Sequence, residues 1–131
     1  EINKSQQVIC PLHPRTRKIL ENLPEKPAFS IIDPVGYFDM IELLKHASLV
    51  MTDSGGLQKE AFFFQNACIT IRDQTEWTEL VDNGYNMLAG ANKESILAAF
   101  EKMRSLNLDF SKDLYGGGKA STNIADVLVS L

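Results

Sequence analysis

The chain has 131 residues, of which 44% are hydrophobic and 23% are charged. This suits one globular domain with a sizeable core but is short for a two-lobed enzyme. A net charge of −4 provides no field to hold DNA or RNA, so we expect no nucleic-acid partner. No apolar run approaches the length of a membrane span, and we expect no membrane partner.

The start of the chain and its two cysteines bear on its origin. It begins at Glu1 with neither a methionine nor a signal-peptide pattern, which predicts either a piece of a longer chain or a cleaved tag. Cys10 and Cys68 lie in apolar runs, and no Cys-x-x-Cys spacing indicates a metal site. We therefore expect two buried thiols in a cytoplasmic protein.

The first strand is predicted at residues 8–12, an apolar run that ends just before Pro14. Proline suits the first turn of a helix, and apolar side chains at helical spacing continue that helix to Leu23. A second strand is predicted at 29–32. A second helical pattern then begins at Tyr37.

Residues 49–52 are apolar enough to form a third strand that is covered on both faces. The turn at residues 53–56 leads into a third helical pattern. A fourth strand is predicted at 67–71. The short helix that follows, from about 75 to 81, ends at the stop signal Asn83-Gly84.

The last part of the chain begins with a short fifth strand, predicted at 86–88. Asn92 is a suitable N-cap for a helix that reaches Met103. Residues 106–118 have little periodicity and end in three glycines, which predicts a linker. A final amphipathic helix is expected from Ile124 to Leu131.

Strand and helix units at this spacing predict an α/β fold, a Rossmann-like parallel sheet with helices on both faces. In such sheets, ligands bind beyond the carboxyl ends of the strands. The residues that follow each strand are therefore the candidate site residues.

The strongest local pattern is the turn Ser54-Gly55-Gly56, where a strand ends and a helix begins. Glycines let a ligand approach the backbone, and the first N–H groups of a helix form an anion site together with the helix dipole. The Ser54 hydroxyl is a further donor. The alternative is a plain helix N-cap after a tight turn. The pattern is not a P-loop, because the Walker spacing is absent.

Glu60 lies between one and two turns into that helix, on the face shared with Gly56. Its two carboxylate oxygens can accept hydrogen bonds from a vicinal diol. A diphosphate on the helix N-terminus and a ribose diol on Glu60 would form a nucleoside-diphosphate site. The alternative is a solvated side chain that pairs with a neighbouring lysine.

The loop Pro34-Val35-Gly36-Tyr37 follows the second strand, and its proline and glycine favour exposed backbone groups. Such a loop can read a base edge through main-chain hydrogen bonds while Met40 packs on the ring. The alternative is a routine strand-to-helix turn with Met40 in the core.

The remaining candidates are three residues at the ends of other strands. Arg72 and Glu76 could hold or polarise a sugar; alternatively they pair with each other, or Asp73 and Glu76 form a capping box. His13 is a candidate acid, base or phosphate donor, or else it bonds the local backbone. Trp77 is interpreted as a packing residue. No nucleophile–base pair or metal cluster assembles from these residues, so the sequence describes a binding half without a certain catalytic residue.

Four runs resemble the C-terminal domain of the non-hydrolysing UDP-N-acetylglucosamine 2-epimerase family, in the order 13–17, 37–40, 49–61 and 71–77. The run that contains Thr-Asp-Ser-Gly-Gly-Leu-Gln-Lys-Glu is highly specific, and the resemblance covers essentially the whole chain. It implies one lobe of a two-lobed fold of the glycosyltransferase-B type. We assign residues 1–105 to its nucleotide-binding, Rossmann-like lobe and 106–131 to a linker and C-terminal helix.

The resemblance also implies an activity for the full-length parent. It would be an isomerase that interconverts UDP-GlcNAc and UDP-ManNAc by elimination and re-addition of UDP, in cell-surface polysaccharide biosynthesis. No cofactor or metal is implied, and the parent is expected to be a homodimer. Acidic residues that move the proton come largely from an N-terminal lobe that this chain lacks, so the chain alone is expected to be inactive.

Site residues can be carried over by position. Ser54, Gly55 and Gly56 would bind the UDP phosphates, and Glu60 would bind the ribose hydroxyls. The backbone near Val35, with Met40, would meet the uracil, although familiar bacterial members have an aromatic residue in place of Met40.

Familiar bacterial members also have an arginine where Trp77 stands. A tryptophan there is similar to relatives that epimerise other sugars, such as UDP-diacetamido-uronic acids. The donor-binding lobe of a UDP-sugar glycosyltransferase, a hydrolysing epimerase and a non-enzymatic nucleotide sensor remain alternatives.

Overall fold

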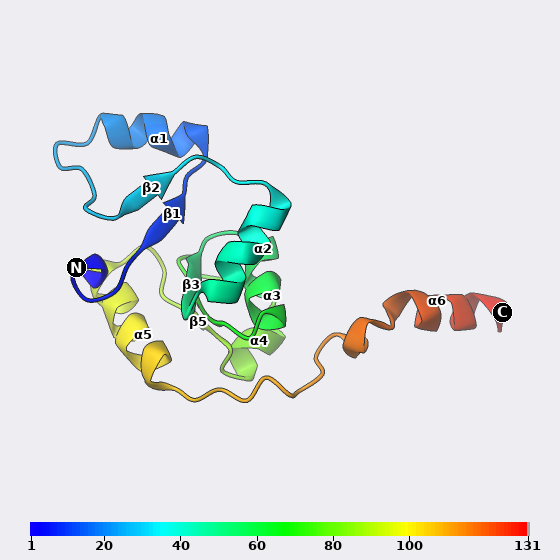
Figure 1. Ribbon diagram of the computed structural model, residues 1–131. Coiled ribbons are helices and arrows are strands. Elements are labelled where there is room, and N and C mark those ends of the chain that lie inside the picture. The colour runs from blue at the N-terminus through cyan, green and yellow to red at the C-terminus, as the bar shows by residue number, and fades with distance from the viewer. Residues whose placement is uncertain (131) are drawn as a thin grey trace. The chain divides into compact units, whose positions relative to one another are not determined.

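The computed structural model describes residues 1–130, which divide into two compact units (Figure 1). The first unit is Glu1–Ala47, and the second begins at Ser48. The predicted domain boundary at residue 105 stays a prediction, and Leu131, the predicted end of the last helix, lies outside the described residues.

The first unit contains a parallel pair of short strands. Strand β1 (Ile9–Pro11) pairs with β2 (Ser30–Ile32). The connection between them contains α1 (Pro14–Glu21), whose Pro14 occupies the first turn as expected. Helix α2 (Tyr37–His46) follows β2, and a 3-10 helix, η1 (Ile2–Lys4), precedes β1.

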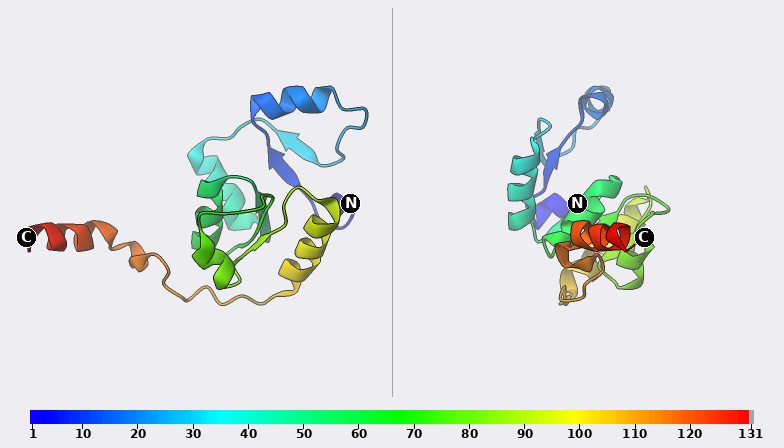
Figure 2. Two further views of the ribbon diagram at one scale, coloured as in Figure 1. Left: turned by 180° about the vertical axis from the view of Figure 1, so that it is seen from behind. Right: turned by 90° about the vertical axis from the view of Figure 1, so that its right-hand side faces the viewer.

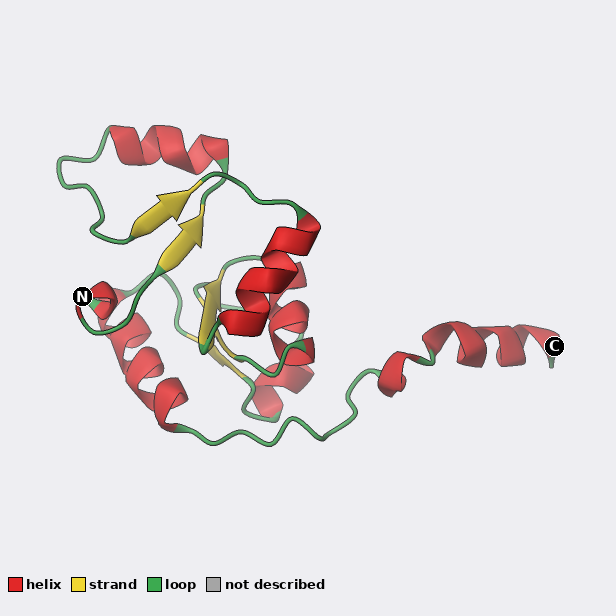
Figure 3. Ribbon diagram, viewed as in Figure 1, coloured by secondary structure: helices red, strands yellow, loops and turns green. Residues whose placement is uncertain are grey.

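The second unit contains a three-stranded parallel sheet in the order β3-β4-β5 (Figure 3). Its strands are β3 (Leu49–Thr52), β4 (Ala67–Thr70) and β5 (Asn86–Leu88). The connections contain α3 (Gly55–Phe63) and α4 (Thr78–Asp82), and the chain continues through α5 (Lys93–Ser105), η2 (Gly116–Gly118) and α6 (Ala120–Val129). Helices α3 and α4 lie on one side of this sheet and α5 lies on the other (Figures 1 and 2).

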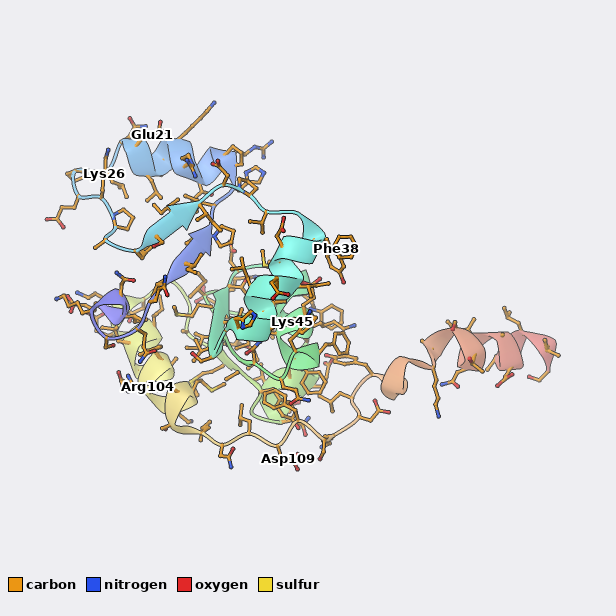
Figure 4. The ribbon with its side chains drawn as sticks, viewed as in Figure 1. Glu21, Lys26, Phe38, Lys45, Arg104 and Asp109 are labelled. Atoms are coloured by element: carbon orange, nitrogen blue, oxygen red, sulfur yellow. The ribbon has the colours of Figure 1, made fainter. Side chains whose placement is uncertain are left out.

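The core of the second unit supports α3 from both the sheet and the later chain. Ile69 of β4 and Ala61 of α3 are fully buried. Phe62, Leu80 and Tyr85 form a buried cluster, against which partly buried side chains pack, namely Trp77, Leu108, Phe110, Leu114 and Tyr115. The Tyr85 hydroxyl donates a hydrogen bond to the carbonyl of Asp109, 2.7 Å away. Asp109 lies on the segment that follows α5 (Figure 4). That segment therefore packs against the core of the second unit, to which it belongs.

The predicted α/β class is confirmed, because every strand pair is parallel and helices connect the strands. The pairings among the described residues form two sheets, one in each unit, where one continuous sheet was expected. The Asn92 cap is as predicted, since its side chain accepts a hydrogen bond from the Ser95 N–H.

Two expectations about local structure are wrong. Helix α4 begins at Thr78 and not near Thr75, because the Thr75 hydroxyl accepts the Trp77 N–H and so competes with a helical turn. Cys68 is buried as predicted, but Cys10 is only half-buried, since β1 belongs to a sheet of two strands. Neither cysteine forms a disulfide within the described part of the chain. No helix within residues 1–130 combines the length and the apolar character that crossing a membrane requires.

Candidate functional site

The turn after β3 presents the first backbone amides of α3 at an exposed surface. Thr52 ends the strand, and its buried side chain accepts a hydrogen bond from the Ser54 N–H at 3.0 Å. Ser54 is the N-cap residue, but its hydroxyl makes no capping hydrogen bond and stays exposed. A Cβ on Gly56 would meet no atom within 4 Å. The helix N-terminus is therefore open to a ligand, as an anion site requires.

Glu60 lies one to two turns along α3 and is half-buried. Within residues 1–130, its carboxylate forms no hydrogen bond or salt bridge. It therefore does not pair with a neighbouring lysine, which was the alternative to a ligand role. The adjacent Lys59 instead places its Nζ 4.3 Å from the ring centroids of both Trp77 and Tyr115. Glu60 is thus available to accept hydrogen bonds from a ligand.

The loop after β4 packs against the same helix N-terminus. The Trp77 indole donates a hydrogen bond to the Gly55 carbonyl at 2.8 Å, in agreement with a packing role. Oε1 of Glu76 lies so close to Gly55 that a Cβ on residue 55 would collide with it. Oε2 of Glu76 lies 3.4 Å from the Arg72 guanidinium. Arg72 and Glu76 therefore pair with each other at the edge of the α3 turn.

Asp73 does not form the capping box with Glu76 that was considered, because α4 begins later, after Trp77. Its carboxylate approaches Gly90, where a Cβ would come within 2.6 Å of Oδ1. Gly90 follows β5 and has a φ of 62°, which favours glycine. Loops from the carboxyl ends of all three strands of the second unit thus form one edge.

Two side chains near Lys59, those of Tyr115 and Glu79, have pKa values shifted from their ordinary ones. Burial, and then the hydrogen bond that Tyr115 donates to Glu79 at 2.7 Å, raise the pKa of the Tyr115 hydroxyl well above its ordinary value. The same hydrogen bond lowers the pKa of Glu79. Tyr115 is therefore neutral and Glu79 is ionised at neutral pH, close to the Lys59 ammonium.

The candidates of the first unit lie after β1 and β2. His13 is the N-cap of α1, and its Nδ1 accepts the Arg15 N–H at 3.3 Å, the local backbone contact that was the alternative to a ligand role. Gly36 is the N-cap of α2. The side chains of Val35, just before this cap, and of Met40, within α2, are both half-buried. Phe38 projects from the first turn of α2 and is 83% exposed (Figure 4).

Comparison with known proteins decides the family. The family model described as UDP-N-acetylglucosamine 2-epimerase matches residues 1–129. The chain belongs to this family. A member named UDP-2,3-diacetamido-2,3-dideoxy-D-glucuronate 2-epimerase, from Pseudomonas aeruginosa, is 51% identical over 124 residues, which are 95% of this chain and 35% of that protein. The UDP-N-acetylglucosamine 2-epimerase of Methanocaldococcus jannaschii is 39% identical over 127 residues, 92% of this chain and 34% of that protein.

Solved structures agree with this membership in the epimerase family. The Methanocaldococcus jannaschii enzyme superposes with a TM-score of 0.84 at 38% identity, covering 99% of this chain and 38% of that chain. A structure of the same enzyme in complex with UDP-GlcNAc and UDP gives a TM-score of 0.81 at 39% identity, covering 98% of this chain and 37% of that chain. The chain thus spans about a third of the length of the epimerases it matches. The fold is one lobe of the glycosyltransferase-B type that these epimerases share.

The sequence pattern assigned no role to Gln58, a buried polar residue beside the candidate site. Gln58 lies in α3 and is completely buried, and its side chain is hydrogen-bonded to Ser54, Thr75 and Asn86. The only signal for it in the sequence was that its neighbours one turn later, Ala61 and Phe62, are apolar. Among the predicted residues, the second unit brings together Ser54, Gly55, Gly56, Glu60, Arg72 and Glu76, and the first unit contains His13, Val35 and Met40. Within residues 1–130, no group of three acidic, histidine or cysteine side chains could hold a metal ion.

Proposed function

We propose that the chain is the C-terminal, UDP-binding half of a UDP-N-acetylglucosamine 2-epimerase. The full-length protein converts UDP-GlcNAc to UDP-ManNAc by elimination and re-addition of UDP, and this chain alone is inactive. The observation that carries the proposal is the exposed start of α3, with an available carboxylate at Glu60 further along the same helix. Membership in the epimerase family supports it.

The turn binds the diphosphate of the substrate in this proposal. The N–H groups of Gly55 and Gly56 and the hydroxyl of Ser54 donate hydrogen bonds to phosphate oxygens, and the helix dipole favours their negative charge. Those donors interact more strongly with UDP as its leaving oxygen gains charge, so the turn also assists elimination. Elimination and re-addition move a proton and the UDP group without a net redox change, so the reaction requires no redox cofactor.

The nucleoside is held by the remaining residues. Glu60 accepts hydrogen bonds from the two ribose hydroxyls, the geometry for which paired carboxylate oxygens are suited. The backbone at Val35, together with Met40, contacts the uracil. We propose that three residues of this chain lie near the sugar, namely Arg72, Glu76 and His13. The lobe that precedes this chain in the full-length protein supplies further acids, and that protein is a cytoplasmic homodimer.

A second candidate substrate is a UDP-diacetamido-uronic acid. Two observations favour it: the 51% identity to the Pseudomonas aeruginosa enzyme named for such a substrate, and Trp77. Trp77 contributes no charge, and its indole is bonded to Gly55, so any cation from this loop comes from Arg72. Incubating the full-length protein with each UDP-sugar and analysing the products separates the two candidates. A transferred sugar or free UDP as the main product would instead indicate a glycosyltransferase or a hydrolysing epimerase.

Calorimetric titration of the full-length protein with UDP tests the binding site. Glu60→Ala should weaken UDP binding by about 1–3 kcal/mol, the range for hydrogen bonds to charged groups. Glu94→Ala is the matched control, because Glu94 is an exposed glutamate in the first turn of α5, and it should leave the affinity unchanged. Equal affinities for the wild type and Glu60→Ala would refute the ribose assignment.

A further inference from the structure

Three consecutive residues of the loop after β4 connect it to the first turn of α3. The Thr75 hydroxyl donates a hydrogen bond to Oε1 of Gln58 at 2.6 Å. The Trp77 indole donates to the Gly55 carbonyl at 2.8 Å. The side chain between them, Glu76, has one carboxylate oxygen against Gly55. The position of Glu76 therefore depends on two hydrogen bonds, one on each side of it.

Gln58 is the buried centre of this arrangement, with 0% of its surface exposed. Its Nε2 donates to the Ser54 carbonyl at 3.3 Å, and its Oε1 also accepts from Nδ2 of Asn86 at 3.0 Å. Oδ1 of Asn86 in turn accepts a hydrogen bond from the buried Thr70 hydroxyl at 2.9 Å. One amide thus links α3, the loop after β4 and two strands.

A buried amide is stable only when its polar atoms have partners, and each of these side chains restricts the others. Glutamine suits the position because a single side chain offers both a donor for Ser54 and an acceptor for Thr75 and Asn86. A glutamate could not donate to the Ser54 carbonyl, and a methionine could form neither kind of hydrogen bond.

We propose that Gln58 is a positioning residue of the nucleotide site, acting through Thr75. From beneath α3 it fixes the carbonyl of Ser54, the residue just before the amides that bind phosphate. Through Thr75 it also sets where Glu76 and its partner Arg72 stand beside those amides. This inference rests on the proposed function, since it assigns a role in binding the same diphosphate.

Thr75 offers the sharper test, because it lies in the partly exposed loop, whereas a change at Gln58 alters the core. Thr75→Val keeps the shape of the side chain but removes both the donor to Gln58 and the acceptor of the Trp77 N–H, whereas Thr75→Ser keeps the hydroxyl. Thr122→Val, on an exposed face of α6, is the control. All variants are made in the full-length protein.

The first readout needs no ligand. The indole ¹H–¹⁵N resonance of Trp77, identified by its loss in Trp77→Phe, reports the hydrogen bond to Gly55. Thr75→Val should shift this resonance, whereas Thr75→Ser and Thr122→Val should leave it near its wild-type position. An unchanged resonance in Thr75→Val would overturn the proposal, because the loop would then not depend on Gln58.

The second readout is UDP affinity, measured on folded protein below the melting temperature of each variant. Thr75→Val should weaken UDP binding roughly 5- to 10-fold, the scale of one hydrogen bond, and Thr75→Ser should restore it. If Thr75→Val lowered the melting temperature but left the UDP affinity unchanged, the Gln58 amide would stabilise the fold only, and the positioning role would be overturned. If the wild-type protein bound no UDP, the proposed function itself would fail, which distinguishes the two failures.

Discussion

The two units of the chain support their strand-to-helix turns differently. In the second unit, the turn after β3 is hydrogen-bonded to the buried side chains of Thr52 and Gln58, beside a sheet of three strands. In the first unit, the turn after β2 follows a sheet of two strands, and Leu44 is the only buried residue between Glu1 and Ala47.

The second unit is therefore the part of the chain in which a site can be pre-organised. A two-stranded sheet buries little and is only marginally stable alone, whereas the packed second unit can hold backbone amides in place before a ligand arrives. We therefore expect the proposed diphosphate site at the α3 turn to be rigid in the absence of ligand. The loop at Val35, which we propose to contact uracil, should be more adaptable.

The largest expected effect separates the cores of the two units. Ile69→Ala in β4 should lower the free energy of unfolding by about 2–5 kcal/mol, because the side chain is fully buried. Ile31→Ala in β2 should cost only about 1–2 kcal/mol, since Ile31 is half-buried. Urea unfolding of both variants measures the difference. Equal losses would show that the first unit is as well packed as the second.

The two cysteines differ between the units in burial, and this difference should appear in the pH dependence of stability. Burial raises the pKa of the Cys68 thiol from 9.0 to about 12. Below pH 9 the thiol is protonated in both states. Between about pH 9 and 12 only the unfolded chain ionises, so the wild type should lose stability relative to Cys68→Ala by up to about 1.4 kcal/mol per pH unit.

Unfolding curves of both proteins from pH 8 to pH 11 check this slope. Thiol labelling of the native protein should modify the half-buried Cys10 before Cys68. Rapid labelling of Cys68, or a stability difference that does not change with pH, would contradict the burial of β4.

Features specified by neighbouring residues were predictable from the sequence. The turn at Ser54-Gly55-Gly56 and the Asn92 cap depend on side chains within a few positions, and both occur where expected. Such signals are local, since an N-cap or a glycine turn involves only adjacent backbone.

Features that depend on distant partners were not predictable. Gln58 is hydrogen-bonded to Thr75 and Asn86, which lie 17 and 28 positions further along the chain, and no local sequence pattern predicts these partners. The late start of α4 has the same origin, because Thr75 is held by Gln58 and by the Trp77 N–H. The half-burial of Cys10 follows from strand pairing, which hydrophobic runs alone do not specify.

The two glycines of the α3 turn provide a smaller effect with a matched control. Gly55→Ala should destabilise the protein by roughly 0.5–1 kcal/mol, since its Cβ would displace the exposed Glu76 carboxylate and separate it from Arg72. Gly56→Ala meets open space and should be neutral or stabilise by about 0.4–1 kcal/mol, while its methyl group obstructs the phosphate. Thermal unfolding and UDP titration of both variants test this. Equal stability of the two variants would contradict the position of the Glu76 carboxylate against Gly55.

The smallest expected effect concerns the charge of Glu76. Glu76→Gln removes a negative charge beside the helix N-terminus and releases Arg72 from its partner, and both changes favour a diphosphate. UDP should bind tighter by about 0.3–1 kcal/mol at low salt, and the gain should shrink as salt is added. Titrations at two ionic strengths measure it. Weaker binding would mean that Glu76 contacts the ligand directly.

A crystal structure of the protein with UDP would show directly whether the α3 turn binds the diphosphate. We predict that the diphosphate lies against the amides of Gly55 and Gly56 and that the ribose hydroxyls lie within hydrogen-bond distance of the Glu60 carboxylate. A diphosphate bound elsewhere, with the α3 turn unchanged and empty, would contradict the account.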